Sequence, residues 1–339
     1  MRAISNELVT IVVVLRDRFS TTEKCLETII ANTPEPYELI VVLGAVPNTL
    51  QKNLAARYEK KARFIFEPQF KNPAEYRNIG LRETKTKLAV LMDNDVYVRP
   101  GWLSSLVDCQ GATQADMVVP LVLEVPDQIH TAGNDLMITH RGGKAYGQKV
   151  LRFAKMMYYE DSNLKRQRTD YGELHCQLVT AETARRLGVY DDRLREAGEV
   201  DSGLAWSKAG AEMWFEPNSV VFYDFPHKIN HVEDIRSYLF KWDMRATLEG
   251  YRYFEKKWDL DITECGNWQK FMVFLNDKVG LLSRLYPARV TLSLDLFFKA
   301  LRKDLLQFSL FRLWRMLKAK VFGFYEWQAA GKDRGDDLL

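Results

Sequence analysis

Apolar runs rich in β-branched residues alternate with helix-like segments at the start of this chain, and this alternation restricts the fold more than any other feature. The first run, Val9–Leu15, is interrupted only by Thr10, which is the pattern of a parallel strand buried on both faces. Similar runs follow after each helical segment. The sequence therefore predicts a doubly wound, mostly parallel α/β sheet with helices on both faces. The further expected strands are Tyr37–Leu43, Arg63–Glu67 and Leu88–Met92, and the expected helices run from Ser20 or Thr21 to Ile30, then Thr49–Lys61 and Ala74–Thr84.

The middle of the chain has a mixed pattern, and the last part reads as mostly helical. The stretch Lys149–Arg168 is polar and aromatic with little periodicity, which predicts an extended or mobile loop. We divide the chain into a sheet domain over 1–230, a helical C-terminal extension over 231–330 and a flexible tail over 331–339. Within the sheet domain, strands are expected at Met117–Glu124, Leu174–Thr180, Met213–Phe215 and Ser219–Tyr223, and helices at Ala181–Leu187 and Asp201–Ala209.

The charge of the chain is nearly balanced overall but uneven along its length. The chain carries 48 Lys and Arg against 45 Asp and Glu, a net charge of +3. Because this balance creates no broad basic field, nucleic acid is not an expected partner. Residues 284–320, however, contain nine basic and two acidic residues. This basic amphipathic segment either lies on an anionic membrane surface or forms a helical subdomain packed on the rest of the protein.

The cysteine count and the apolar runs bear on the expected compartment. The four cysteines form no CxxC motif, and this usage is typical of a reducing compartment. No small-residue cleavage site follows the short apolar run near the N-terminus, and no stretch reaches the roughly 18 apolar residues of a membrane-spanning helix. We expect a cytoplasmic protein, or one bound peripherally to the inner face of the membrane.

Two carboxylates follow the strand expected at Leu88–Met92. Ligands of such sheets bind beyond the carboxyl ends of the strands, which is where Asp93 and Asp95 lie. A carboxylate pair with this spacing can hold Mg²⁺ or Mn²⁺ together with a diphosphate, although a solvated turn is the alternative. In the preceding helix, Arg77 could face the same phosphates or could simply be an exposed helix arginine.

A second acidic pair and a histidine pair are further candidates. Glu199 or Asp201 could accept a proton from an attacking hydroxyl, and Asp201 could equally cap the helix that follows. His227 and His231 are four residues apart and would share a face of a helix, and His227 could be a third metal ligand or an unliganded loop histidine. The remaining histidines show no partner at ligand spacing in the sequence: His130, His140 and His175.

The order of these motifs resembles the family 2 glycosyltransferases, which have the Rossmann-like GT-A fold. The resemblance covers roughly residues 8–230 and rests on Arg77-Asn78-x-Gly80, Asp93-Asn94-Asp95, Glu199-Val-Asp201 and the later Pro217-x-x-Val-Val. The segment from His130 to Gly133, with Gly142-Gly143, is similar to one in rhamnosyltransferase-like members.

The resemblance implies an inverting transfer of a sugar from a nucleotide-sugar to the hydroxyl of a saccharide or lipid-linked saccharide. Asp93 and Asp95 would hold Mn²⁺ or Mg²⁺ with the diphosphate, and Glu199 matches the position of the family's base. Arg77, Asn78 and Asn94 would bind the donor.

The chain departs from the family pattern at three positions. Gly198 stands where the family has Glu, which keeps Asp201 as a second candidate base. The family's acidic residue near the end of strand two is missing at Leu43-Gly44-Ala45, and Asp17 is the expected substitute. Tyr223 occupies the place of a family histidine, and His227 follows it.

Two other functions compete with glycosyl transfer. A nucleotidyltransferase uses similar sheets and acidic metal sites, but it normally has a Gly-rich phosphate loop after strand one, whereas Leu15–Phe19 contains no glycine. A non-catalytic carbohydrate-binding protein of the same fold is the second alternative. The departures from the family pattern favour this alternative, and the presence of both Asp93 and Asp95 disfavours it.

Overall fold

The computed structural model describes residues 8–124, 127–154, 156–158, 164–188, 190–194, 197–224, 234, 237 and 244–262. These residues belong to one compact unit, formed by 1–225 and 231–274, so helix α8 (Met244–Trp258) lies in the same unit as the sheet. The predicted ligand His227, the basic segment 284–320 and the tail 331–339 lie outside the described residues. The domain boundary at 230 stays a prediction.

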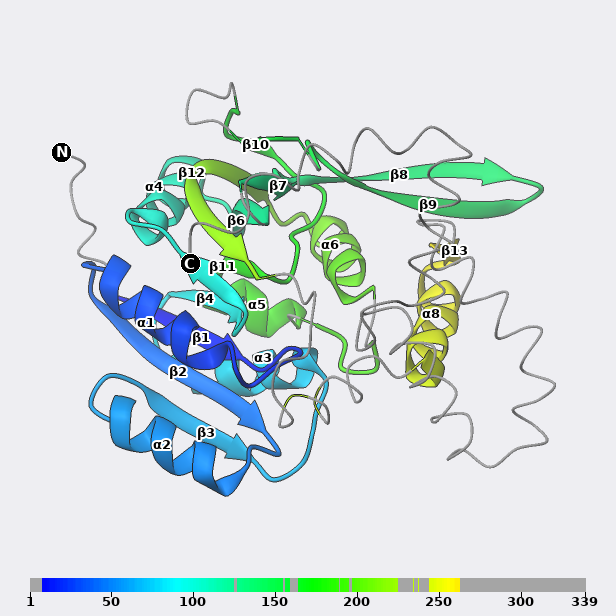
Figure 1. The fold of residues 1–339 in the computed structure, drawn as a ribbon. Helices are drawn as coiled ribbons and strands as arrows, with labels where there is room; N and C mark the ends of the chain where they lie inside the picture. The colour runs from blue at the N-terminus through cyan, green and yellow to red at the C-terminus, as the bar shows by residue number, and fades with distance from the viewer. Residues whose placement is uncertain are drawn as a thin grey trace, which may run out of the picture. The chain divides into compact units, whose positions relative to one another are not determined.

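A large, mostly parallel sheet forms the core of this unit and confirms the predicted fold class (Figure 1). Its strand order is β10-β12-β6-β11-β4-β1-β2-β3, with β5 and β7 added at its side. The antiparallel strand β11 interrupts the parallel pattern between β4 and β6. The strands are β1 (Val9–Val14), β2 (Tyr37–Gly44), β3 (Arg63–Glu67), β4 (Leu88–Asp93), β5 (Val96–Val98), β6 (Met117–Glu124), β7 (Gln128–Thr131), β10 (Gln167–Arg168), β11 (Cys176–Thr180) and β12 (Met213–Tyr223).

The predicted strands coincide closely with the observed ones where the sequence runs are continuously apolar. All six residues of β1 and all six of β4 are buried. Each strand lies inside the sheet, β1 between β2 and β4 and β4 between β1 and β11, and both of its faces are covered. The predicted Met213–Phe215 and Ser219–Tyr223 are one strand, β12, whose register against β6 shifts between Glu216 and Val220. The sequence patterns do not predict strand β5 or helix α4.

The helices of the unit pack on this sheet and on each other. Helix α3 packs against β1 and β2, and α4 packs against β6 and β12. Gly80 of α3 permits a close approach, since an added Cβ would overlap the side chain of Val12 on β1. The helix bounds are α1 (Thr22–Asn32), α2 (Asn48–Tyr58), α3 (Pro73–Glu83), α4 (Trp102–Thr113), α5 (Ala181–Leu187) and α6 (Gly198–Lys208).

Helix α1 begins where the sequence predicts, but its start is held differently. Thr21 is the N-cap residue without a side-chain capping bond. Asp234 holds the loop just before the helix, because its Oδ1 accepts hydrogen bonds from the backbone N–H groups of Phe19 at 2.6 Å and Ser20 at 3.1 Å. A distant acidic residue therefore fixes the loop between β1 and α1.

A long hairpin of β8 (Asn134–Arg141) and β9 (Lys144–Leu151) extends from the main sheet, and β13 (Leu260–Asp261) pairs with β9 (Figure 1). The prediction of a loop over Lys149–Arg168 is therefore wrong at both ends, since Lys149–Leu151 belong to β9 and Gln167–Arg168 form β10. The hairpin turn falls at Gly142 and Gly143, which have positive φ angles of 56° and 78°.

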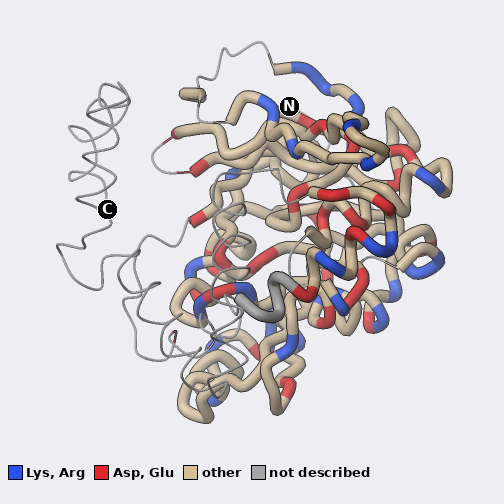
Figure 2. Tube along the Cα trace, turned by 90° about the vertical axis from the view of Figure 1, so that its right-hand side faces the viewer, with Lys and Arg blue, Asp and Glu red and all other residues tan. Residues whose placement is uncertain are grey.

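Basic and acidic residues interleave along the described part of the chain (Figure 2). Within that part, none of the helices is both long and apolar enough to span a membrane.

Candidate active site

Acidic side chains follow two neighbouring parallel strands at the same edge of the sheet. Val14 of β1 pairs with Asp93 at the end of β4, so the loops after these strands lie side by side. Asp17, Asp93 and Asp95 are all buried there. Burying several carboxylates together is costly unless positive charges or hydrogen bonds compensate them. The partners of each carboxylate therefore define what the site can bind.

Asp93 is anchored between two arginines. Arg16 Nη1 donates to its Oδ2 at 2.7 Å, and Arg77 Nη2 donates to its Oδ1. His175 Nδ1 lies 3.4 Å from Oδ2, with a geometry that falls short of a hydrogen bond. Burial opposes the ionisation of Asp93, but the charges of Arg77 and Arg16 outweigh it and hold the pKa of this carboxyl well below its usual range. Asp93 is therefore an ionised group whose charge is already compensated.

Asp17 and Asp95 lack such hydrogen-bonded arginine partners. Among the described residues, neither oxygen of either carboxyl group accepts a hydrogen bond. Burial, and after it the charge of Asp93, raises the pKa of Asp95 well above its usual range. A hard divalent cation would supply the missing partner, because Mg²⁺ and Mn²⁺ prefer oxygen ligands.

The spacing of the ligand atoms also fits an ion. One carboxylate oxygen from each of Asp93 and Asp95 and one ring nitrogen of His175 lie within 4.8 Å of one another. Since the two oxygens of Asp95 are without hydrogen-bond partners among the described residues, this residue has the greatest free capacity to bind a cation. The side chains present therefore fit Mn²⁺ or Mg²⁺.

The two predicted asparagines contact the backbone of neighbouring loops. Asn94 donates to the carbonyl oxygen of Arg18 at 2.6 Å and accepts from the backbone N–H of Arg16 at 2.9 Å. Asn78 donates to the carbonyl oxygen of Tyr190 at 3.0 Å. These bonds fix the loops on both sides of Asp93, so both residues shape the site from within the protein.

The two candidate bases point in different directions from α6. This helix begins before Asp201, the predicted first residue, so both carboxylates lie in its first turn and neither caps it. Residues two apart on a helix do not share a face. Glu199 accepts from Lys149 Nζ of β9 at 2.5 Å, whereas Asp201 accepts from Trp258 Nε1 and lies beside Lys257 Nζ, both at 2.7 Å. The carboxylate of Asp201 thus ties α6 to the end of α8.

Two histidines that show no ligand spacing in the sequence meet beside Asp93. His130 of β7 and His175 before β11 are 45 residues apart in the chain, yet their Nε2 atoms lie 3.3 Å apart. The ring of Tyr223 stacks on His175 with centroids 3.9 Å apart. The antiparallel pairing of β11 with β4 brings residue 175 next to Asp93, and the sequence pattern gives no signal for this pairing.

Burial keeps both of these imidazoles neutral near pH 7. It lowers the pKa of His130, and it lowers the pKa of His175 to about 3, with the Asp93 contact opposing the shift and Arg16 and His130 adding to it.

The variant His175→Gln is expected to reduce the loss of stability at acid pH. His175 titrates near pH 6.5 when unfolded but near 3 when folded, so the folded state resists protonation. Its contribution is intact above about pH 6.5 and falls, by up to about 1.4 kcal/mol per pH unit, as the pH decreases toward the folded pKa. Urea denaturation at about pH 7.5, 6 and 5 measures the slope. An unchanged acid slope in the variant would contradict this assignment.

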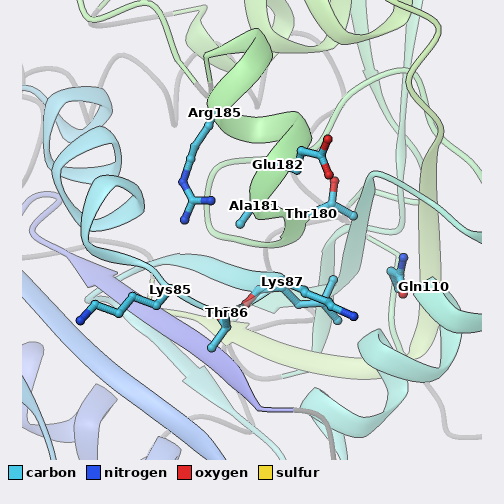
Figure 3. Close-up of a pocket in the computed structure, with 9 residues that line it drawn as sticks. Lys85, Thr86, Lys87, Gln110, Thr180, Ala181, Glu182 and Arg185 are labelled. Carbon is cyan, nitrogen blue, oxygen red and sulfur yellow. Dashed lines mark hydrogen bonds between the residues drawn. The ribbon is translucent and has the colours of Figure 1, made fainter.

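A pocket of about 460 Å³ lies at the other edge of the sheet (Figure 3). Its lining includes Leu88, the first residue of β4, whereas Asp93 is the last residue of that strand. Five residues along a strand span about 17 Å, and this length separates the pocket from Asp93. Figure 3 shows Arg185 and Glu182 of α5 across from Lys85 and Lys87. This pocket is therefore separate from the acidic site.

Comparison with known proteins identifies the class of the chain and then its family. The structure of GalNAc-T7 with UDP, GalNAc and Mn²⁺ aligns with 80% of this chain and 54% of that one, at a TM-score of 0.52 and 16% identity. S. aureus TarS 1–349 in complex with UDP-GlcNAc aligns at a TM-score of 0.47 and 11% identity, over 71% of this chain and 66% of that one. The fold is that of the GT-A glycosyltransferases.

The family follows from the sequence. The model of glycosyl transferase family 2 matches residues 10–181, half of the chain, and the chain belongs to this family. The pre-mycofactocin glycosyltransferase of Mycobacterium tuberculosis is 24% identical over 165 residues, which are 47% of this chain. The match covers 32% of that relative, so the chain spans about a third of its length.

Proposed function

We propose that this protein is a metal-dependent glycosyltransferase that moves a sugar from a nucleotide-sugar to an acceptor hydroxyl, with inversion by a single displacement. The observation that carries the proposal is the pair of buried carboxylates without hydrogen-bond partners among the described residues, Asp17 and Asp95, at the strand ends of a family 2 chain. The GalNAc-T7 structure contains UDP, GalNAc and Mn²⁺, which favours a UDP-sugar as the first donor to test and a saccharide as the acceptor class.

In this proposal Asp95, together with Asp93, holds Mn²⁺ or Mg²⁺ and the donor diphosphate. The bound cation supplies neutralising charge for the departing nucleoside diphosphate. Arg77 contributes positive charge to the phosphates while it anchors Asp93, and Asn78 and Asn94 keep the donor loops in position. Asp17 accepts hydrogen bonds from the nucleoside, in place of the acidic residue that the family carries near the end of strand two.

Glu199 is the proposed base. Its carboxylate takes the proton of the acceptor hydroxyl as the oxygen bonds to the anomeric carbon and the bond from that carbon to the diphosphate oxygen breaks. The proximity of Glu199 to Glu173, which lies beside His175 near Asp93, supports this role, because it places the carboxylate on the side of the donor site. The contacts of Asp201 with Trp258 and Lys257 support a structural role for that residue instead.

Two finer predictions concern residues outside the described part of the chain: His227 as a further metal ligand, and contact of residues 284–320 with an anionic membrane. The choice between a free and a lipid-linked saccharide acceptor is a third finer prediction.

A thermal-shift screen of nucleoside diphosphates and nucleotide-sugars, with and without Mn²⁺, tests the function. One nucleotide is expected to raise Tm only when Mn²⁺ is present, since a ligand at about 100 times its Kd stabilises the folded state by about 2.7 kcal/mol. Release of the nucleoside diphosphate in the presence of saccharide acceptors then measures transfer. Metal-dependent binding without transfer would favour the carbohydrate-binding alternative, and release of inorganic diphosphate from nucleoside triphosphates would favour a nucleotidyltransferase.

A further inference from the structure

Three potential metal ligands gather beside the donor site, from segments that the proposed function does not use. His130 comes from β7, and Glu173 and His175 come from the segment before β11. One ligand atom from each, two ring nitrogens and a carboxylate oxygen, lies within 4.8 Å of the other two. This donor set has two ring nitrogens and one carboxylate oxygen, whereas the group at Asp93 and Asp95 has two carboxylate oxygens and one ring nitrogen, from the same His175.

The distance between the two imidazoles matches the edge of a tetrahedral metal site. Zn²⁺ binds histidine nitrogen at about 2.0–2.1 Å, so two such ligands at the tetrahedral angle are about 3.3–3.4 Å apart. The Nε2 atoms of His130 and His175 are 3.3 Å apart. The two rings cross at 70° in a T-shaped arrangement, so they do not stack on each other.

The outer contacts of the two rings also fit metal ligands. His130 Nδ1 lies 3.1 Å from Glu124 Oε2, the carboxylate–histidine arrangement that fixes the tautomer of a ligating imidazole. His175 Nδ1 faces Asp93 Oδ2 at 3.4 Å. In the tautomer with a proton on each Nδ1, both Nε2 atoms are acceptors, and a cation between them would take the place of a hydrogen bond.

Tyr223 holds the rings in this arrangement. It stacks on His175 and meets His130 at an edge, with centroids 5.3 Å apart and an interplanar angle of 62°. The imidazoles are thus positioned by packing from β12 as well as by their carboxylate neighbours, which is what a preorganised site requires.

We propose that His130, His175 and Glu173 form a second metal site, selective for a borderline-soft divalent ion of the Zn²⁺ class. Imidazole nitrogen favours Zn²⁺ over Mg²⁺ or Mn²⁺, which bind preferentially to oxygen. Three protein ligands leave a fourth tetrahedral position for water or another small ligand. The site shares His175 with the group at Asp93 and Asp95 but differs from it in the other two ligands, His130 and Glu173.

Titration of the full-length, chelator-treated protein with Co²⁺, as a spectroscopic substitute for Zn²⁺, tests the site. One equivalent is expected to bind with the intense visible absorption of four-coordinate Co²⁺, and Zn²⁺ is expected to displace it. His130→Ala and Glu173→Ala should each weaken binding by about 100-fold or more, and Glu124→Gln by about 10- to 100-fold. His140→Ala is the matched control, because His140 is exposed on β8.

The experiments distinguish a failure of this metal-site proposal from a failure of the proposed function. Asp95→Asn should keep the four-coordinate Co²⁺ spectrum even if it loses Mn²⁺-dependent nucleotide binding. Absence of a four-coordinate spectrum in the wild-type protein would overturn the proposal and leave a plain hydrogen bond between the two histidines. If His130→Ala does not fold, the unfolding midpoint of the wild-type protein is measured with and without Zn²⁺ instead. A metal site in the folded state must raise this midpoint, and an unchanged midpoint would overturn the proposal.

Discussion

Asp95→Asn is expected to abolish Mn²⁺-dependent binding of a nucleoside diphosphate, with a loss of affinity of about 100-fold or more, or about 2.7 kcal/mol. The substitution keeps the shape of the side chain but replaces a negative ligand with a neutral amide. Asp93 alone is not expected to hold the cation, because Arg16 and Arg77 already compensate its charge. Calorimetric titration with the nucleotide identified in the screen, with and without Mn²⁺, measures the effect.

The same substitution should leave the metal-free protein as stable as the wild type or more stable, by on the order of 1 kcal/mol, since it removes a buried carboxylate that accepts no hydrogen bond from the described residues. Loss of function with gained stability distinguishes a ligand from a structural residue. Asp127→Asn is the matched control, because Asp127 is exposed and its carboxylate pairs with Arg99 on the surface. An unchanged Mn²⁺-dependent affinity in Asp95→Asn would refute the metal assignment.

Most of the sheet could be predicted because its strands are buried on both faces. Apolar runs rich in β-branched residues, such as Val9–Leu15, and short apolar runs such as Leu88–Met92 predict strands, and their bounds agree with β1 and β4 within one residue. The β8–β9 hairpin could not be predicted in this way. Its residues are largely half-buried or exposed, so β9 shows no apolar alternation and its pattern around Lys149 is that of a loop.

The residues of the candidate site also divide into those that the sequence predicts and those that it does not. Asp93 and Asp95 could be predicted because the carboxyl end of a parallel strand is a defined place in the fold. The meeting of His130 with His175, and of Lys149 with Glu199, depends on the antiparallel strand β11 and on the hairpin. Contacts across such non-local pairings leave no periodicity in a single sequence.

Glu199→Gln is expected to keep donor binding and to reduce the transfer rate by about 10²- to 10⁴-fold, the usual contribution of a general base. The amide retains the size of the side chain and can still accept a hydrogen bond from Lys149, but it cannot take the acceptor proton. Transfer of the sugar under saturating donor and acceptor, together with calorimetric donor affinity, separates the two effects.

Asp201→Asn provides the contrast within the same helix turn. Its carboxylate contacts Trp258 and Lys257, so its loss is expected to lower the unfolding free energy by about 1–3 kcal/mol while the transfer rate stays near that of the wild type. Full turnover in Glu199→Gln with loss of turnover in Asp201→Asn would exchange the two roles. Because residues two apart on a helix face different neighbours, only one of these carboxylates can serve the acceptor, and the pair of variants decides which.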